Sequence, residues 1–148
     1  MKIVDCTTYH SEDLMMDVRF NILNKYVDKF VVTESKFSHS GNPKPLKFNI
    51  NNFPKFKDKI KYLDIENEPK DIIQKNNISS SEKRINSILR IEQSYDYMME
   101  SIDDASDNDL ICYSDNDEIP NFDSEQFKKS KKNIFVFKQL FFYYKFNL

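Results

Sequence analysis

Apolar residues recur at four-residue intervals close to the N-terminus. Leu14, Val18, Ile22 and Tyr26 follow this spacing, which places them on one side of an α-helix. With support from Met15 and Leu23, the pattern predicts an amphipathic helix from Ser11 to Tyr26. Ser11 is the expected N-cap, because its hydroxyl can accept a hydrogen bond from a free backbone N–H of the first turn.

A second helical pattern lies in the middle of the chain. Ser79, with Glu82 three residues later, has the spacing of a capping box. Apolar residues then follow at helical spacing: Ile85, Ile88, Leu89, Tyr95 and Met99. These features predict a helix from Ser79 to about Glu100.

Short apolar or alternating runs predict five strands, at residues 2–6, 29–33, 59–65, 110–113 and 133–138. A loop at 35–54, a polar connection at 67–77 and a short polar helix at 124–131 are expected to join them. Strands that alternate with helices form βαβ units. The order therefore predicts an α/β fold, with a mostly parallel sheet flanked by helices.

Composition narrows the function classes. The 148 residues suit one domain, and acidic and basic residues are interspersed with a net charge of −2, so no basic face for nucleic acid is expected. A single glycine excludes the P-loop and the G-x-G-x-x-G fingerprint. No apolar stretch approaches the length of a membrane span, and no targeting signal is evident, so a cytoplasmic protein with reduced Cys6 and Cys112 is expected.

Carboxylates follow the predicted strands. Asp5, Glu34 and Asp64 end the first three, and Asp115 and Asp117 follow the fourth directly. Ligands of open parallel sheets bind at the carboxyl ends of the strands. Carboxylate oxygens there suit Mg²⁺ or Mn²⁺ shared with substrate phosphates. The pattern favours a metal-assisted reaction of a phosphate-bearing substrate.

A D-x-D pair alone has a simpler interpretation, because solvated acidic turns are common. An EF-hand is a poorer one, since no glycine occupies the sixth position counted from Asp115. The context favours a site: the pair ends an apolar strand and is followed at once by Ile119 and Pro120.

The residues also resemble a known family, glycosyltransferase family 17, which contains the β-1,4-mannosyl-glycoprotein N-acetylglucosaminyltransferases. The similar segments run in order along nearly the whole chain: Asp5-Cys6, Glu12-Asp13-Leu14, Arg19, 27–32, Glu34-Ser35, His39-Ser40-Gly41, 43–46, 57–60 and 114–120. The resemblance implies a GT-A-type, Rossmann-like fold over residues 1–148, forming one nucleotide-sugar-binding domain. It also implies a UDP-sugar donor such as UDP-GlcNAc, a glycan acceptor and inverting transfer.

Roles for individual residues follow from the resemblance. Asp117 is the implied metal ligand, and Asp115 is expected to contact the metal or the ribose. Glu34 and Arg84 match acids and arginines that related enzymes aim at the nucleotide, and Thr7 is expected near it. Each has a simpler alternative, since a strand-end acid or a helical arginine is often only solvated.

Other conspicuous residues favour structural interpretations. His39 suits an ordinary turn, Arg19 suits an ion pair with a neighbouring acid, and both cysteines suit small core positions. Glu118 is expected to brace the loop rather than to react.

The C-terminal part of the sequence departs from the family pattern. Members are usually longer, and the part after the metal motif supplies the acceptor pocket and the general base. We therefore expect no general base in this chain, and self-association or a partner chain through the aromatic segment at 141–146. The alternative function is a nucleotide-sugar-binding module without transfer. A nucleotidyltransferase is a third candidate, weakened by the lack of a glycine-rich opening.

Overall fold

The computed structural model describes residues 1–122, 129 and 133–138. Within residues 1–122 it contains four strands and two α-helices, with two short 3₁₀ helices between the second and third strands. In chain order the elements are β1 (Ile3–Thr8), α1 (Asp13–Leu23), β2 (Lys29–Ser35), η1 (Ile50–Asn52), η2 (Lys57–Lys59), β3 (Ile60–Ile65), α2 (Ser80–Glu100) and β4 (Leu110–Tyr113). The first four predicted strands and both predicted long helices are therefore present, with small shifts at their ends.

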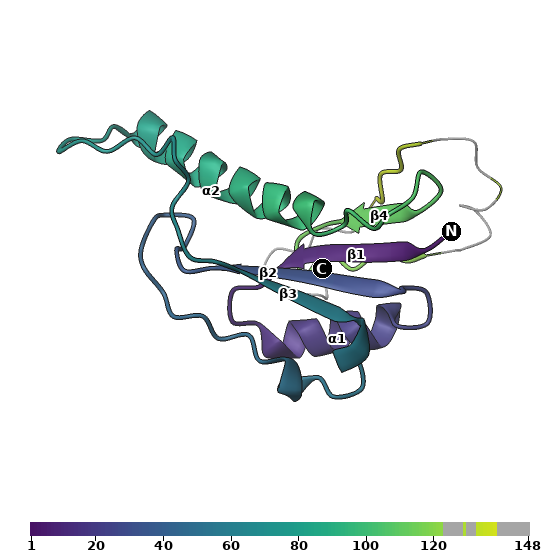
Figure 1. Ribbon diagram of the computed structural model, residues 1–148. Helices are drawn as coiled ribbons and strands as arrows, with labels where there is room; N and C mark the ends of the chain where they lie inside the picture. Colours follow the sequence, from purple (N-terminus) through teal and green to yellow (C-terminus); the bar gives the residue numbers. More distant parts are fainter. Residues whose placement is uncertain (123–128, 130–132, 139–148) are drawn as a thin grey trace, which may run out of the picture.

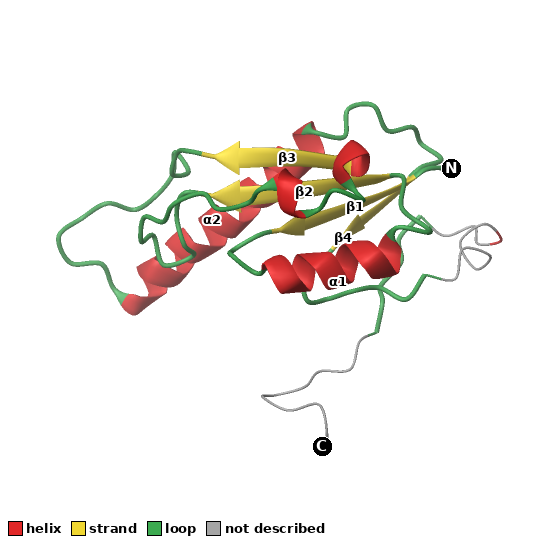
Figure 2. Ribbon diagram, turned by 90° about the horizontal axis from the view of Figure 1, so that it is seen from below, coloured by secondary structure: helices red, strands yellow, loops and turns green. Residues whose placement is uncertain are grey.

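All four strands are parallel and lie in the order β3-β2-β1-β4. In Figure 2 the arrows of the sheet point the same way, so all the carboxyl ends meet at one edge. The chain adds β2 and β3 on one side of β1 and then returns to add β4 on the other side. This reversal is a topological switch point, and it lies between β1 and β4. The predicted parallel α/β architecture is confirmed.

The two helices cover opposite faces of the sheet (Figure 1). On the α1 face, Phe20 packs against the rings of Phe30, Phe53 and Phe56, with centroid separations of 4.7, 5.2 and 5.5 Å. On the α2 face, a smaller cluster joins Met98 to the strands. The aromatic half of the core thus fixes α1 and the β2–β3 connection together.

Most of the apolar residues at four-residue spacing in α1 do not face the core, although Tyr26, just after the helix, packs against it. Leu14 is 79% exposed, and Val18 and Ile22 are also exposed. The buried side is Met16, Phe20 and Leu23, together with Arg19. Both stripes have helical spacing, and the larger side chains of the second stripe fill the space between α1 and the sheet.

The buried face of α2 is largely polar. Ile85, Ile88 and Met99 are exposed, whereas the buried positions are largely polar: Asn86, Arg90, Ser94 and Met98. The apolar stripe therefore does not mark the side of α2 that meets the sheet. The polar side chains that do face inwards make hydrogen bonds, which is the usual condition for burying them.

The starts of the two helices test the capping predictions. The capping box of Ser79 and Glu82 is confirmed, with both reciprocal hydrogen bonds formed. Ser11 does not cap α1: the helix begins two residues later, and Ser11 has a φ of 98°. Its backbone takes part in the turn that follows β1, so its side chain is not placed at the helix start.

The fifth predicted strand is absent. Within the described residues, 133–138 form no strand, and Ile134 and Val136 are 81% and 88% exposed. Alternation of apolar residues is not sufficient for a strand, which also needs a neighbouring strand for its hydrogen bonds. The predicted helix at 124–131 falls largely outside the described residues, and the aromatic segment at 141–146 lies wholly outside them.

Among the described helices, none is both long and apolar enough to cross a membrane. The long helix α2 fails on polarity rather than on length.

Candidate functional site

A cavity of about 280 Å³ lies at the carboxyl edge of the sheet. Its lining comes from the end of β1 and the following turn (Thr8, Tyr9, His10, Glu12), from β2 and the following loop (Thr33, Ser35, Phe37, His39, Lys44), from α2 (Arg90, Ser94) and from the loop after β4 (Asp115, Asn116, Asp117). The two loops at the switch point thus contribute to one cavity. This is the place where open α/β sheets bind ligands.

Arg19 fixes the loop Ser114–Glu118, which we call the acidic loop. Its Nε and Nη2 donate to the two carboxylate oxygens of Asp5, each at 2.8 Å, and both side chains are completely buried. Its Nη1 donates to the carbonyl of Asp115 at 2.8 Å, and Nη2 also donates to the hydroxyl of Ser114 at 2.7 Å. Asp5, predicted to end β1, instead lies within the strand and anchors this arginine. The interpretation of Arg19 as an ion-pair residue is confirmed.

The acidic loop turns its carboxylates outwards. Asp115 and Asp117 are exposed and line the cavity. Within the described part of the chain, neither carboxylate takes part in a hydrogen bond or an ion pair. Arg19, the nearby cation, donates to backbone carbonyls of the loop instead. The side chain of Glu118 accepts a hydrogen bond from the backbone N–H of Asp115 at 3.4 Å, which agrees with a bracing role.

Glu12 connects the two loops of the switch point. Its Oε2 accepts hydrogen bonds from the backbone N–H of His10 at 2.7 Å and from Nδ2 of Asn116 at 2.9 Å. The rings of His10 and His39 lie 6.4 Å apart at the same cavity. Both histidines of the chain therefore line the same cavity as the acidic loop.

Tyr95 of α2 approaches the acidic loop from the other side. Its ring meets that of Tyr113 edge-on at 4.3 Å. Burial raises the pKa of Tyr95, and the negative charges of Asp115 and Glu118 raise it further. The phenol is therefore held neutral beside the carboxylates.

Glu34 is committed to the loop that follows β2. Its buried carboxylate accepts hydrogen bonds from Nζ of Lys44 at 2.7 Å, from the backbone N–H groups of Lys47 and Phe48, and from the hydroxyl of Tyr62. Burial raises the pKa of Glu34, but these donors outweigh it and the pKa is lowered overall. In this structure Glu34 shapes the cavity wall through the loop, and its oxygens are already occupied.

Two further predicted site residues have different positions. Thr7 is buried below the cavity, where its hydroxyl donates to the carbonyl of Ser114 at 3.0 Å. Arg84 is exposed on the first turns of α2 and lines a different cavity, beside Lys83 and Ser87. The structure therefore brings Asp115 and Asp117 together at the cavity, places Thr7 beneath their loop, and leaves Arg84 outside.

Sequence reasoning missed Arg90. It lies on the buried side of α2, pairs with Glu68 through Nε and Nη2 at 2.7 and 2.8 Å, and donates to the carbonyl of His39 at 3.1 Å. A search for polar residues within the inward-facing repeat of α2, rather than within its apolar stripe, could have found it. Thr8, Thr33 and His10 were also missed, and no spacing in the sequence distinguishes them.

Asp115 and Asp117 could supply some, but not all, of the ligands of a cation. Among the described residues, no group of three or more His, Cys, Asp or Glu side chains is arranged to hold a metal ion. Asp115 and Asp117 supply unoccupied, hard oxygen donors at the cavity. Such a pair suits a hard cation that takes its remaining ligands from water and phosphate.

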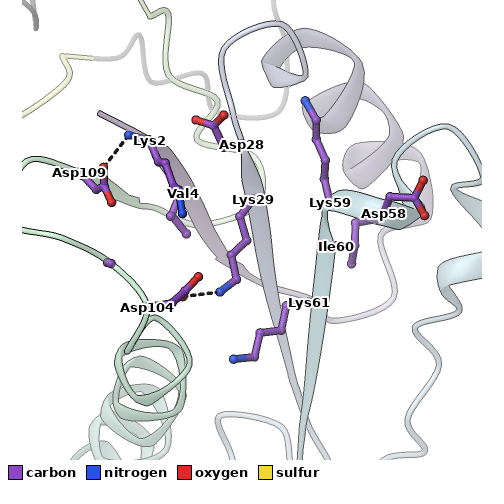
Figure 3. A pocket seen from close by; sticks show the side chains of 11 residues that line it. Lys2, Val4, Asp28, Lys29, Asp58, Lys59, Ile60, Lys61, Asp104 and Asp109 are labelled. Atoms are coloured by element: carbon purple, nitrogen blue, oxygen red, sulfur yellow. Dashed lines mark hydrogen bonds and ion pairs between the residues drawn. The ribbon is translucent and has the colours of Figure 1, made fainter.

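Another cavity, of about 330 Å³, lies at the opposite, amino-terminal edge of the sheet (Figure 3). Its lysines are largely engaged: Lys29 pairs with Asp104 at 2.8 Å, and Nζ of Lys61 donates to the carbonyl of Ser101 at 2.7 Å. These contacts stabilise the C-terminal end of α2, where cations interact favourably with the helix dipole. They indicate a structural role for this end of the molecule.

Comparison with known proteins identifies the family of the chain. The sequence profile of Glycosyltransferase family 17 matches residues 1–144. The chain is 43% identical over 47 residues to the beta-1,4-mannosyl-glycoprotein 4-beta-N-acetylglucosaminyltransferases of Homo sapiens and Rattus norvegicus, and 40% identical to that of Mus musculus. Each match covers 32% of this chain and 9% of the relative. No solved structure matches the chain. With its profile matched over nearly its whole length and the acidic loop at the switch point of a parallel sheet, the chain belongs to glycosyltransferase family 17.

Proposed function

We propose that this chain binds the donor of a metal-dependent, inverting glycosyltransferase, which moves a sugar from a UDP-sugar to a glycan acceptor. The observation that carries the proposal is the orientation of Asp115 and Asp117, whose carboxylates face the switch-point cavity without a partner in the described part of the chain. The family supports sugar transfer as the reaction class. The names of the relatives, which are N-acetylglucosaminyltransferases, support an N-acetylhexosamine as the donor sugar.

Asp117 and Asp115 are the proposed ligands of Mn²⁺ or Mg²⁺. When bound, such an ion neutralises the charge that develops on the departing diphosphate. Arg19 holds the backbone of the loop that carries the two carboxylates, so little rearrangement of that backbone is needed when the donor arrives. Preorganised charges of this kind are the most effective form of electrostatic stabilisation.

Inversion requires an acceptor hydroxyl to attack the anomeric carbon from the side opposite the departing diphosphate. A base must then take the hydroxyl proton. We assign that base to no described residue. Donor binding and sugar transfer are therefore separate parts of the proposal and need separate tests.

Calorimetry tests the first part. UDP is expected to bind at least about tenfold more tightly with Mn²⁺ than with EDTA, because Asp115 and Asp117 would hold a cation that attracts the diphosphate. Asp117→Ala should abolish this difference. Asp64→Ala is the matched control: Asp64 is an exposed acid near the carboxyl end of β3 but does not line the cavity. Equal affinity with and without metal would remove the proposed role of the acidic loop.

A donor-hydrolysis assay addresses the second part. Release of sugar from UDP-GlcNAc or another UDP-hexose by this chain would support transferase chemistry. Tight metal-dependent binding with no release would favour the alternative function, a nucleotide-sugar-binding module. The calorimetric result stands in either case.

A further inference from the structure

Thr33 carries an unpaired buried hydroxyl. The residue lies near the carboxyl end of β2 and is 1% exposed. Among buried side-chain nitrogen and oxygen atoms in the described part of the chain, its Oγ1 alone lacks a hydrogen-bond partner. Buried hydroxyls are almost always paired, because an unpaired one has lost its water without compensation. The exception calls for an explanation.

The surroundings of Thr33 point to a ligand. The side chain lies on the α2 face of the sheet, since it alternates with Val31, which packs against Met98 of α2. There it lines the switch-point cavity together with Thr8, its neighbour in register on β1. Valine has nearly the same shape as threonine and is strongly favoured in strands. A hydroxyl at this position therefore adds nothing to the packing of the strand against α2.

The distance between Thr33 and the acidic loop indicates which part of the donor lies next to Thr33. The acidic loop follows β4, and β2 lies two strands away in the sheet, a separation of roughly 10 Å at the usual strand spacing. A diphosphate held at Asp115 and Asp117 extends to the sugar on one side and to the nucleoside on the other. The transferred sugar must stay open to an acceptor, so the buried end of the cavity suits the nucleoside.

We infer that Thr33 Oγ1 hydrogen-bonds the nucleoside of the nucleotide-sugar donor and thereby positions it. The inference rests on the proposed donor-binding function and adds a residue to it. A hydroxyl can both donate and accept, so it can meet a carbonyl of the base or a hydroxyl of the ribose. Bound donor would supply the hydrogen-bond partner that the described residues do not give this hydroxyl.

Thr33→Val gives the test, because it removes the hydroxyl and keeps the shape. Without ligand, the variant is expected to unfold at the same temperature as the parent protein or higher, since an unpaired buried group has been removed. In calorimetry it should bind UDP with Mn²⁺ about tenfold more weakly. The affinity for uridine should fall by the same factor. Thr33→Ser, which keeps a hydroxyl, should retain most of the parent protein's affinity for both ligands.

Thr7→Val is the matched control, because the Thr7 hydroxyl already donates to the carbonyl of Ser114. This variant should unfold at a lower temperature than the parent protein. The opposite signs of the two stability changes separate an unpaired hydroxyl from a structural one.

Failure of the inference and failure of the proposed function give different results. If the parent protein does not bind UDP even with Mn²⁺, the proposed function falls and the inference falls with it. If the parent binds UDP and Thr33→Val binds it equally well, only the inference is overturned. A lower unfolding temperature for Thr33→Val would also overturn it. A loss seen with UDP but not with uridine would reject contact with the nucleoside.

Discussion

Arg19 and Asp5 form a completely buried, two-bond ion pair, with both N–O distances at 2.8 Å. The same guanidinium also donates to the backbone of the acidic loop. A buried arginine needs partners for nearly all of its donors, and here Asp5 and the loop supply them. The pair therefore links α1, the middle of β1 and the acidic loop.

Replacement of Arg19 should strongly destabilise the protein. Arg19→Met leaves the Asp5 carboxylate buried without its partner, which typically costs about 3–5 kcal/mol. Urea unfolding at pH 7 measures this change. Arg84→Met is the matched control, since exposed substitutions usually shift stability by less than about 0.5 kcal/mol. Similar unfolding midpoints for the two variants would contradict the anchoring role of Arg19.

A double variant separates stability from site geometry. Asp5→Leu with Arg19→Met replaces the pair by apolar side chains, which often restores much of the stability. The acidic loop would still lack the donors that hold its carbonyls. We therefore expect the double variant to be more stable than Arg19→Met alone, yet to remain deficient in Mn²⁺-dependent UDP binding by calorimetry. Full recovery of binding would show that the loop does not depend on Arg19.

Glu34 should make the stability depend on acidic pH. Its pKa in the folded state is lowered below the ordinary value of 4.5. Its contribution is therefore complete above pH 4.5 and is lost as the pH falls through the folded-state pKa. Glu34→Gln should be less stable than the parent at pH 7, and the difference should shrink below pH 4.5.

Urea unfolding between pH 7 and pH 3 tests this prediction. Glu66→Gln is the control, because Glu66 forms an exposed ion pair with Lys36, and such pairs contribute little. Its effect should be small at every pH. A Glu34→Gln difference that stays constant across the whole range would contradict the assigned pKa shift.

Gly41 is needed for the contact between its loop and α2. Its φ is +86°, and an added Cβ would lie 2.5 Å from Nη2 of Arg90. Gly41→Ala should therefore displace Arg90 from Glu68 and lower stability by about 1–3 kcal/mol. Asn42→Ala, at the adjacent exposed position, should change stability far less. Equal unfolding midpoints for the two variants would show that the loop adapts without strain.

The two cysteines should remain free thiols. They lie on adjacent strands, but Cys6 packs with the α2-face cluster and Cys112 with the α1-face cluster, so they point to opposite sides of the sheet. Burial raises the pKa of each thiol to about 12. Alkylation in denaturant without reductant should modify both, whereas the folded protein should react slowly. Recovery of a Cys6–Cys112 peptide after proteolysis would contradict this geometry.

The sequence by itself determined the order of the main elements. Apolar runs and helical spacing predicted the four strands and the two long helices that form, because these local patterns favour strand or helix. The same rules also predicted a strand at 133–138, which does not form. The capping box of Ser79 and Glu82 was also readable, since both partners lie within one turn. The acidic loop could be placed at the end of β4 for the same reason: the strand and the motif are adjacent in the chain.

Only the tertiary structure decided which side of each helix is buried and which polar groups meet. In α1, Leu14 and Phe20 belong to competing stripes, and the aromatic cluster on the sheet selects Phe20. Arg90 and Thr33 reach the same cavity from different elements. Their proximity depends on how α2 crosses β2, and contacts between residues so far apart in sequence follow from packing rather than from local spacing.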